Sequence, residues 1–223
     1  MLNLQPLPYP VAPVRRPWDA RLARRLVTPL IHSWVTPNHL TTLRLMVGLA
    51  AAAAFIPGSY GWSNIAALLL ILSNFLDHTD GELARMSGKT SRIGHLYDLA
   101  SDAAVTILLF IAIGVGVAAK PGIDLGVPPA ILGLVAGTAI ALIFYMRMRI
   151  EELLGKAATQ QAYLGGFETE DVLYLLPLGT LSNALVPMLV AAAICAPLFA
   201  VWVVIDYLRV LRRDRRMAAG VAG

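Results

Sequence analysis

Residues 77–102 read DHTDGELARMSGKTSRIGHLYDLASD, and this stretch places four aspartates at the facing ends of two apolar segments. Positions three and four apart lie on one face of a helix, so the stretch predicts two polar stripes. The first stripe consists of Asp77, Asp80, Gly81, Ala84 and Arg85, and the second consists of Gly94, Asp98 and Asp102. The polar connection over residues 86–93 is short, which predicts an antiparallel helix pair with the two stripes turned toward each other.

The convergence of four carboxylates predicts a metal site. Carboxylates held close together repel one another, and divalent cations are the simplest way to keep them ionised. Hard oxygen ligands favour Mg²⁺, Mn²⁺ or Ca²⁺ over zinc. Two metals bridged by carboxylates can stabilise both the attacking and the leaving oxygen of a displacement at phosphorus. The small residues on the stripes leave room for a phosphate ligand, and Arg85 can neutralise its charge.

A purely structural interpretation is that these acids are solvated helix ends paired with Arg85, Lys89 and Arg92. It accounts for two acids but not for four on facing stripes. His78 and His95 flank the motif, and we expect them to pack beside the site because oxygen-rich sites favour hard ions. Glu82 points away from the stripe, so we expect it to be solvated or paired with a basic residue.

The composition of the whole chain is typical of a membrane protein. Its 223 residues are 57% hydrophobic and 14% charged, whereas soluble domains carry roughly 45–50% apolar and about 25% charged residues. Each crossing needs about 20 apolar residues, which leaves room for some five to seven spans and no further soluble domain. The single cysteine, Cys195, lies in an apolar stretch and is expected to be a small buried hydrophobe.

The apolar segments predict six membrane helices in an all-α fold. Their expected ranges are Leu40–Ile56, Trp62–Arg85, Gly94–Ala119, Pro128–Leu154, and a long region Val172–Leu208 that is divided into a short and a long helix. The dividing turn is placed near Ser182-Asn183, with Ala196-Pro197 as an alternative.

Basic residues set the expected orientation, because Lys and Arg accumulate in cytoplasmic loops. They cluster before the first helix, between the second and third, after the fourth and after the sixth, whereas the opposite loops hold only Lys120. Six spans with both termini in the cytoplasm fit this pattern, and five or seven do not. The net charge of +4 is then a topology signal, and no nucleic-acid partner is expected.

The N-terminal segment predicts a helix on the membrane surface. Trp18, Leu22, Leu26 and Leu30 recur at helical spacing, a pattern typical of amphipathic surface helices; a frayed basic tail is the alternative. The first residues lack a signal-peptide core, so we expect them to be retained. We therefore expect a cytoplasmic segment 1–39, a six-helix domain 40–211 and a basic tail 212–223.

The spacing Asp-x2-Asp-Gly-x2-Ala-Arg-x8-Gly-x3-Asp-x3-Asp resembles, without departure, the signature of the CDP-alcohol phosphotransferase family of integral-membrane phospholipid-synthesising enzymes. The string TPNHLT at residues 36–41 is similar to the family's entry into its first helix. The resemblance implies a six-helix homodimer with a cytoplasmic N-terminal surface helix and an active site at the cytoplasmic boundary. The expected location is a bacterial-type cytoplasmic membrane.

The resemblance also implies roles for the motif residues. Asp77, Asp80, Asp98 and Asp102 would bind two divalent cations, Mg²⁺ or Mn²⁺, and Asp102 would be the general base that deprotonates an acceptor hydroxyl. Gly81, Ala84 and Gly94 would pack against the cytidine nucleotide. Arg85 would contact the diphosphate, with weaker contacts from Asn38 and Thr41.

The implied reaction is transfer of a phosphatidyl group from CDP-diacylglycerol to a small polar alcohol, with release of CMP. A CDP-polyol donor such as CDP-inositol is the alternative within the family, because the string GELAR at residues 81–85 resembles inositol-phosphate-handling members. An ion or proton transporter is a more distant alternative, since intramembrane acids also mark ion pathways. The acids lie at the membrane boundary and no repeat is visible, which favours the enzyme.

Two further groups frame the expected acceptor pocket. Arg147 and Arg149 end the fourth predicted helix, and they would suit a phosphorylated polyol. Glu168 and Asp171 open the fifth, and they would suit a neutral or cationic alcohol. Both groups also match simple helix-dipole complementarity, and the sequence does not decide between these acceptors.

Overall fold

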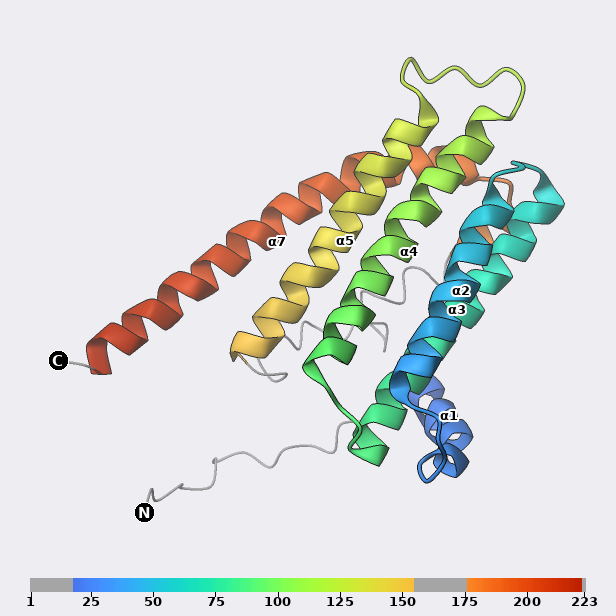
Figure 1. Ribbon diagram of the computed structural model, residues 1–223. Helices are drawn as coiled ribbons and strands as arrows, with labels where there is room; N and C mark the ends of the chain where they lie inside the picture. Colours follow the sequence, from blue (N-terminus) through green and yellow to red (C-terminus); the bar gives the residue numbers. More distant parts are fainter. Residues whose placement is uncertain (1–17, 155–175, 222–223) are drawn as a thin grey trace.

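The computed structural model describes residues 18–154 and 176–221, and in these ranges the regular structure is entirely helical (Figure 1). The elements are α1 (Trp18–Val27), a short 3-10 turn η1 (Thr28–Leu30), α2 (Pro37–Phe55), α3 (Tyr60–Ser87), α4 (Arg92–Ala118), α5 (Pro129–Leu154), α6 (Leu176–Leu181) and α7 (Leu185–Val221). The predicted all-α class is therefore confirmed for the described ranges.

Within the described ranges, three helices are long and apolar enough to cross a membrane: Arg92–Ala118, Pro129–Ile150 and Leu185–Arg212. Helices α2 and α3 lie beside them but carry more polar residues, among them Ser63, Asn64 and the acids of the motif. The predicted Val172 start of the fifth helix lies outside the described residues. The chain thus has the character of a membrane protein, and the count of six spans stays a prediction.

Helix ends follow local sequence signals. Helix α2 begins three residues earlier than predicted, because Pro37 suits the first position of a helix and the Thr36 amide donates to Nδ1 of His39 at 3.2 Å. The predicted turn at Ser182-Asn183 separates α6 from α7, and Asn183 adopts the left-handed φ of 53° that asparagine tolerates. The alternative turn was wrong, since Pro197 lies inside α7.

Helix α1 confirms the helix predicted before the first apolar segment. Among its described side chains, Ala23 and Val27 are buried, and the helix packs on α3. Leu22 and Leu26 are 42% and 52% exposed, so part of the predicted apolar stripe is turned away from the protein. That leaves these leucines free to contact a membrane surface, which stays a prediction.

Helix α2 lies between α3 and α4 and packs against both. Helices α3 and α4 are antiparallel as predicted, but they do not pack directly on each other. Gly48 permits this arrangement, because a Cβ there would lie 2.7 Å from Cγ1 of Val105 on α4 and 3.1 Å from Oγ of Ser73 on α3. The expected helix pair is therefore a three-helix unit, and the two acidic stripes face each other across α2.

Among the described residues, the larger of two apolar core clusters lies toward the end of the bundle away from the acids. It joins α2, α3, α4 and α5 with the start of α7 through residues such as Phe55, Leu70, Leu109 and Leu189. Cys195 lies on α7 and is exposed, so the prediction that it is buried within the protein was wrong. Helix α7 stands at the edge of the bundle (Figure 1), and Ile194 beside Cys195 is exposed as well.

Candidate active site

A turn between α3 and α4 sets the spacing of the acidic residues. Helix α3 ends at Ser87 and is capped by Gly88, whose φ of 67° is left-handed and suits glycine; the Gly88 amide donates to the carbonyl of Ala84 at 3.1 Å. Helix α4 then begins after Ser91, whose Oγ accepts the Gly94 amide at 2.9 Å. Asp77 and Asp80 therefore lie in the last turns of α3, and Asp98 and Asp102 lie in the first turns of α4.

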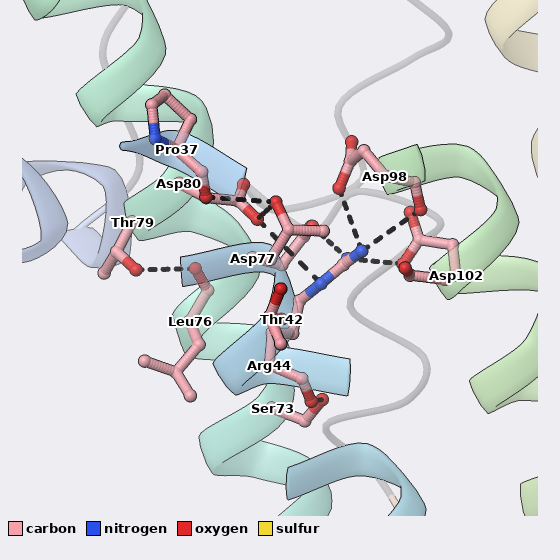
Figure 2. A network of polar contacts seen from close by, with 12 residues as sticks. Pro37, Thr42, Arg44, Ser73, Leu76, Asp77, Thr79, Asp80, Asp98 and Asp102 are labelled. Atoms are coloured by element: carbon pink, nitrogen blue, oxygen red, sulfur yellow. Dashed lines mark hydrogen bonds and ion pairs between the residues drawn. The ribbon is translucent and has the colours of Figure 1, made fainter. Parts of the chain in front are cut away.

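All four aspartates meet at one arginine that the sequence prediction missed. Arg44 lies on α2 between the acids of α3 and those of α4 (Figure 2). Its Nη1 donates to Oδ1 of both Asp77 and Asp102, and its Nη2 donates to Oδ1 of Asp98 at 2.9 Å. Its Nε lies 4.0 Å from Oδ2 of Asp80. The side chain is only 4% exposed, so the guanidinium is a buried cation shared by four carboxylates.

One signal could have found Arg44. It is the only charged residue in the apolar run predicted over 40–56, and a charge inside a membrane helix is costly unless it has partners or a function. The pattern of α2 alone does not say that those partners are the four aspartates, because they come from two other helices.

Three of the four carboxylates form a group that could hold a cation. Asp77, Asp98 and Asp102 each offer an oxygen, and these oxygens lie within 4.8 Å of one another. Their side chains are 36%, 36% and 48% exposed, so an ion could reach them from solvent. This all-oxygen set has the chemistry that Mg²⁺ and Mn²⁺ prefer. The residues present therefore fit a divalent cation.

Asp80 has a different environment from the other three. Its side chain is 6% exposed, and its Oδ2 accepts a hydrogen bond from Oγ1 of Thr41 at 2.8 Å. Thr41 is itself buried on α2. Thr41, predicted to contact the nucleotide, therefore contacts a predicted metal ligand in this structure.

The residues predicted to bind the nucleotide lie around the same end of the bundle. Arg85 is 61% exposed and its Nη2 contacts Oε1 of Glu82 at 3.0 Å. The predicted pairing of Glu82 with a basic residue is thus confirmed, although Glu82 is buried and not solvated. A Cβ on Gly94 would lie 2.8 Å from Oδ1 of Asn38, which brings these two predicted residues together across α2 and α4. Gly81 lies beside the Arg85 guanidinium.

Of the remaining predicted residues, some lie within the described part of the structure and others lie outside it. Arg147 and Arg149 are half-buried near the end of α5, and both have interaction partners. Glu168 and Asp171 lie outside the described residues. Among the residues that the structure describes, the candidate metal group contains neither His78 nor His95.

A pocket of about 350 Å³ opens beside Asp102 between α4 and α5. Its other lining residues are apolar or aromatic: Leu96, Leu99, Ala100, Ala103, Ala141, Phe144 and Tyr145. The carboxylate that was predicted to be the base therefore borders both the acidic group and an apolar cavity.

The fold and site define an all-helical membrane protein with a cluster of acidic side chains at one end of its bundle. The family model for CDP-alcohol phosphatidyltransferase matches residues 34–205, and the chain therefore belongs to this family. The resemblance inferred from the motif is confirmed.

Several curated relatives are about one-third identical to this chain over the residues that align. A CDP-diacylglycerol–glycerol-3-phosphate 3-phosphatidyltransferase of Cereibacter sphaeroides is 34% identical over 36% of this chain and 37% of its own length. An archaetidylinositol phosphate synthase of Pyrococcus horikoshii is 33% identical over 44% of this chain and 52% of its own length. A cholinephosphotransferase of Danio rerio is 34% identical over 38% of this chain and 24% of its own length. The matches thus span about a quarter to a half of these relatives.

Two solved structures of one protein share the fold. The phosphatidylinositol phosphate synthase of Mycobacterium tuberculosis with CDP-DAG bound has a TM-score of 0.56 and 22% identity, covering 87% of this chain and 94% of the other. The same enzyme in complex with manganese and citrate has a TM-score of 0.54 and 21% identity, covering 88% of each chain.

Proposed function

We propose that this protein transfers a phosphatidyl group from CDP-diacylglycerol to a small polar alcohol in a reaction that requires a divalent cation and releases CMP. One observation carries the proposal: the complete acidic motif folds so that oxygens of Asp77, Asp98 and Asp102 lie within 4.8 Å of one another. A site built for displacement at phosphorus needs such an oxygen-rich group. The names of the curated relatives support the same reaction class.

In this proposal the acceptor hydroxyl attacks the β-phosphorus of the donor. The new bond joins the acceptor oxygen to that phosphorus, and the bond from the phosphorus to the bridging oxygen of CMP breaks, so that CMP leaves with the electron pair. Asp102 takes the proton of the hydroxyl, since it is the most exposed of the four aspartates and borders the pocket. Divalent cations held by Asp77, Asp80, Asp98 and Asp102 would neutralise the charge that develops on the phosphates.

The nucleotide end of the donor would lie against Gly81, Ala84 and Gly94, with Arg85 on the diphosphate. Arg85 suits that role because its guanidinium is largely exposed and can form paired hydrogen bonds to phosphate oxygens. Asn38 lies against Gly94 and would contact the nucleotide beside it. Thr41 would act indirectly, by holding Asp80 through its hydrogen bond.

For the acceptor we propose a phosphorylated polyol. Arg147 and Arg149 are half-buried cations near the end of α5, the helix that also lines the pocket at Asp102. Two curated relatives carry names that refer to a glycerol phosphate or an inositol phosphate. A transfer from a CDP-polyol such as CDP-inositol is the alternative, and it rests on the similarity of the string GELAR at residues 81–85 to inositol-phosphate-handling members of the family.

The proposal includes a membrane arrangement. Six spans with both termini and the acidic site in the cytoplasm would agree with the one-sided distribution of basic residues. Helix α1 would rest on the membrane surface through Leu22 and Leu26, and two copies of the chain would associate.

The direct test is a transfer assay with purified protein. Radiolabelled CDP-diacylglycerol is incubated with Mg²⁺ or Mn²⁺ and a panel of alcohols that contains glycerol phosphate, inositol phosphate, inositol and serine. We expect CMP release only with metal, and fastest with a phosphorylated acceptor. If no acceptor releases CMP from CDP-diacylglycerol, the same panel is run with CDP-inositol and lipid acceptors; activity there would replace the primary proposal with the alternative.

A further inference from the structure

Arg44 contacts the same three carboxylates that could hold a divalent cation. Its Nη1 contacts Asp77 and Asp102, its Nη2 contacts Asp98, and these three residues form the candidate metal group. A guanidinium donates hydrogen bonds only and cannot ligate a metal, so it uses lone pairs of the same three carboxylates that a metal would use. The two cations therefore depend on one set of three carboxylates.

We propose that Arg44 is a built-in counter-ion of the acidic site, which holds the carboxylates together in the metal-free protein and competes with the divalent cation for them. The inference rests on the proposed metal-dependent function. Arg44 is a positioning residue in this proposal, because it acts through the aspartates and not on the reacting atoms.

The place of α2 in the fold explains why such a residue is needed. Helices α3 and α4 carry two acids each, they face each other across α2, and they do not pack directly on each other. With all four aspartates ionised and no cation, mutual repulsion would push the two helices apart. Arg44 projects from the helix between them and contacts acids on both sides, so one side chain joins α3 to α4 (Figure 2).

The choice of arginine also fits the role. Its charge is permanent and its planar fork can serve several carboxylates at once, whereas a lysine is a single point charge. One positive charge against four negative charges leaves a net charge of −3 among these five side chains when all are ionised. The cluster therefore stays strongly attractive to a divalent cation even while Arg44 occupies its centre.

The test compares Arg44→Gln and Arg44→Lys with the wild-type protein in detergent, after chelation of metals. Binding of Mn²⁺ is measured from the electron paramagnetic resonance signal of the free ion. The temperature of thermal unfolding is measured with and without Mn²⁺. Removal of the competing charge should lower the Mn²⁺ Kd of Arg44→Gln by at least about tenfold, because the repulsion between a unit charge and a divalent ion at contact distance is at least that large even with water-like screening. The metal-free variant should unfold at a lower temperature than wild type, and Mn²⁺ should raise that temperature by more than it does in wild type.

Arg44→Lys keeps the charge, so its Mn²⁺ Kd should stay close to the wild-type value. The matched control is Lys89→Gln, which removes one positive charge at the same end of the bundle; Lys89 donates to the carbonyls of Ser33 and Val35 and to none of the aspartates. Its Mn²⁺ Kd should be unchanged.

Equal or weaker Mn²⁺ binding by Arg44→Gln would overturn the proposal, as would a wild-type protein that binds no Mn²⁺. If Arg44→Gln folds only with metal, it is purified in Mn²⁺ and the release of the ion to excess chelator is timed. Slower release than from wild type supports competition, and equal or faster release contradicts it. These readouts need no substrate, so a failed transfer assay would reject the proposed reaction while leaving the role of Arg44 to be judged by metal binding.

Discussion

The two ends of the helix bundle are held together in opposite ways. At the end away from the acids, glycines bring helix backbones into direct contact: a Cβ on Gly116 of α4 would overlap the carbonyl oxygen of Phe55 on α2, and one on Gly133 of α5 would overlap that of Phe110 on α4. At the acidic end, α3 and α4 are joined through the side chain of Arg44. Backbone packing holds the helices together at the first end, whereas ion pairs join α3 to α4 at the second.

This difference assigns the stability of the fold and the chemistry of the site to different ends of the molecule. Close packing of backbones leaves little room to move and depends on no ion. The charged end is partly open to solvent and presents carboxylates whose partners can be exchanged, which a site for a metal and a phosphate ligand requires. Substitutions at the two ends should therefore affect different measurements.

The largest expected effect is on turnover from Asp102→Asn. Loss of a general base typically lowers the rate by about 10²–10⁴-fold, because the acceptor hydroxyl then keeps its proton in the transition state. CMP release in the transfer assay measures the rate, and equilibrium binding of the CDP donor should be largely retained. Asp124→Asn is the control, since Asp124 lies in the loop between α4 and α5 and accepts the Gly126 amide. Turnover at the wild-type rate by Asp102→Asn would show that another group accepts the proton.

The next effect concerns metal affinity at the charged end. Asp98→Asn removes a carboxylate of the candidate metal group and should weaken Mn²⁺ binding by at least about 10–100-fold, the usual cost of losing even an outer hydrogen-bonding partner of a ligand. Titration of the metal-free protein with Mn²⁺ measures the change. Chelation should likewise stop CMP release, and added Mg²⁺ or Mn²⁺ should restore it. Unchanged Mn²⁺ affinity in Asp98→Asn would remove this residue from the ligand set.

A smaller effect, on stability alone, is expected at the packed end from Gly133→Ala. The added methyl group meets the Phe110 carbonyl and must push α5 away from α4, which should cost about 1–3 kcal/mol in the free energy of unfolding. Gly61→Ala on α3 is the matched control, because a Cβ there has no atom within 4 Å, and alanine should leave stability equal or slightly higher. Mn²⁺ affinity should be the same in both variants. A loss of Mn²⁺ affinity in Gly133→Ala would show that the two ends are coupled.

The acidic stripes could be predicted from the sequence because helical periodicity depends only on the spacing of residues within a single helix. The spacing of Asp77 from Asp80, and of Asp98 from Asp102, fixes a common face on each helix, and the short connection between them fixes an antiparallel direction. The turn at Asn183 was also predictable from local residue preferences.

The position of α2 was not predictable by the same reasoning. Which helix packs between two others depends on side chains that are far apart in the sequence, such as Gly48 against Val105 and Ser73. Arg44 was missed for that reason, because its partners lie 33 to 58 positions away along the chain. The burial of Asp80 likewise depends on Thr41 of α2, which periodicity within α3 does not reveal.

The smallest effect is expected from Thr41→Val, which tests how far the charged end depends on α2 beyond Arg44. The substitution keeps the shape of the side chain and removes the hydrogen bond to the buried Asp80, at a cost of about 1 kcal/mol in the free energy of unfolding. Thr42→Val is the matched control, because the neighbouring hydroxyl is exposed and contacts Oη of Tyr97 at 2.9 Å instead of an aspartate. If Asp80 binds metal, Thr41→Val should also change Mn²⁺ affinity whereas Thr42→Val should not. Equal Mn²⁺ affinity in the two variants, with the loss of stability confined to Thr41→Val, would mean that Asp80 anchors α3 to α2 and that the metal depends on the other three aspartates.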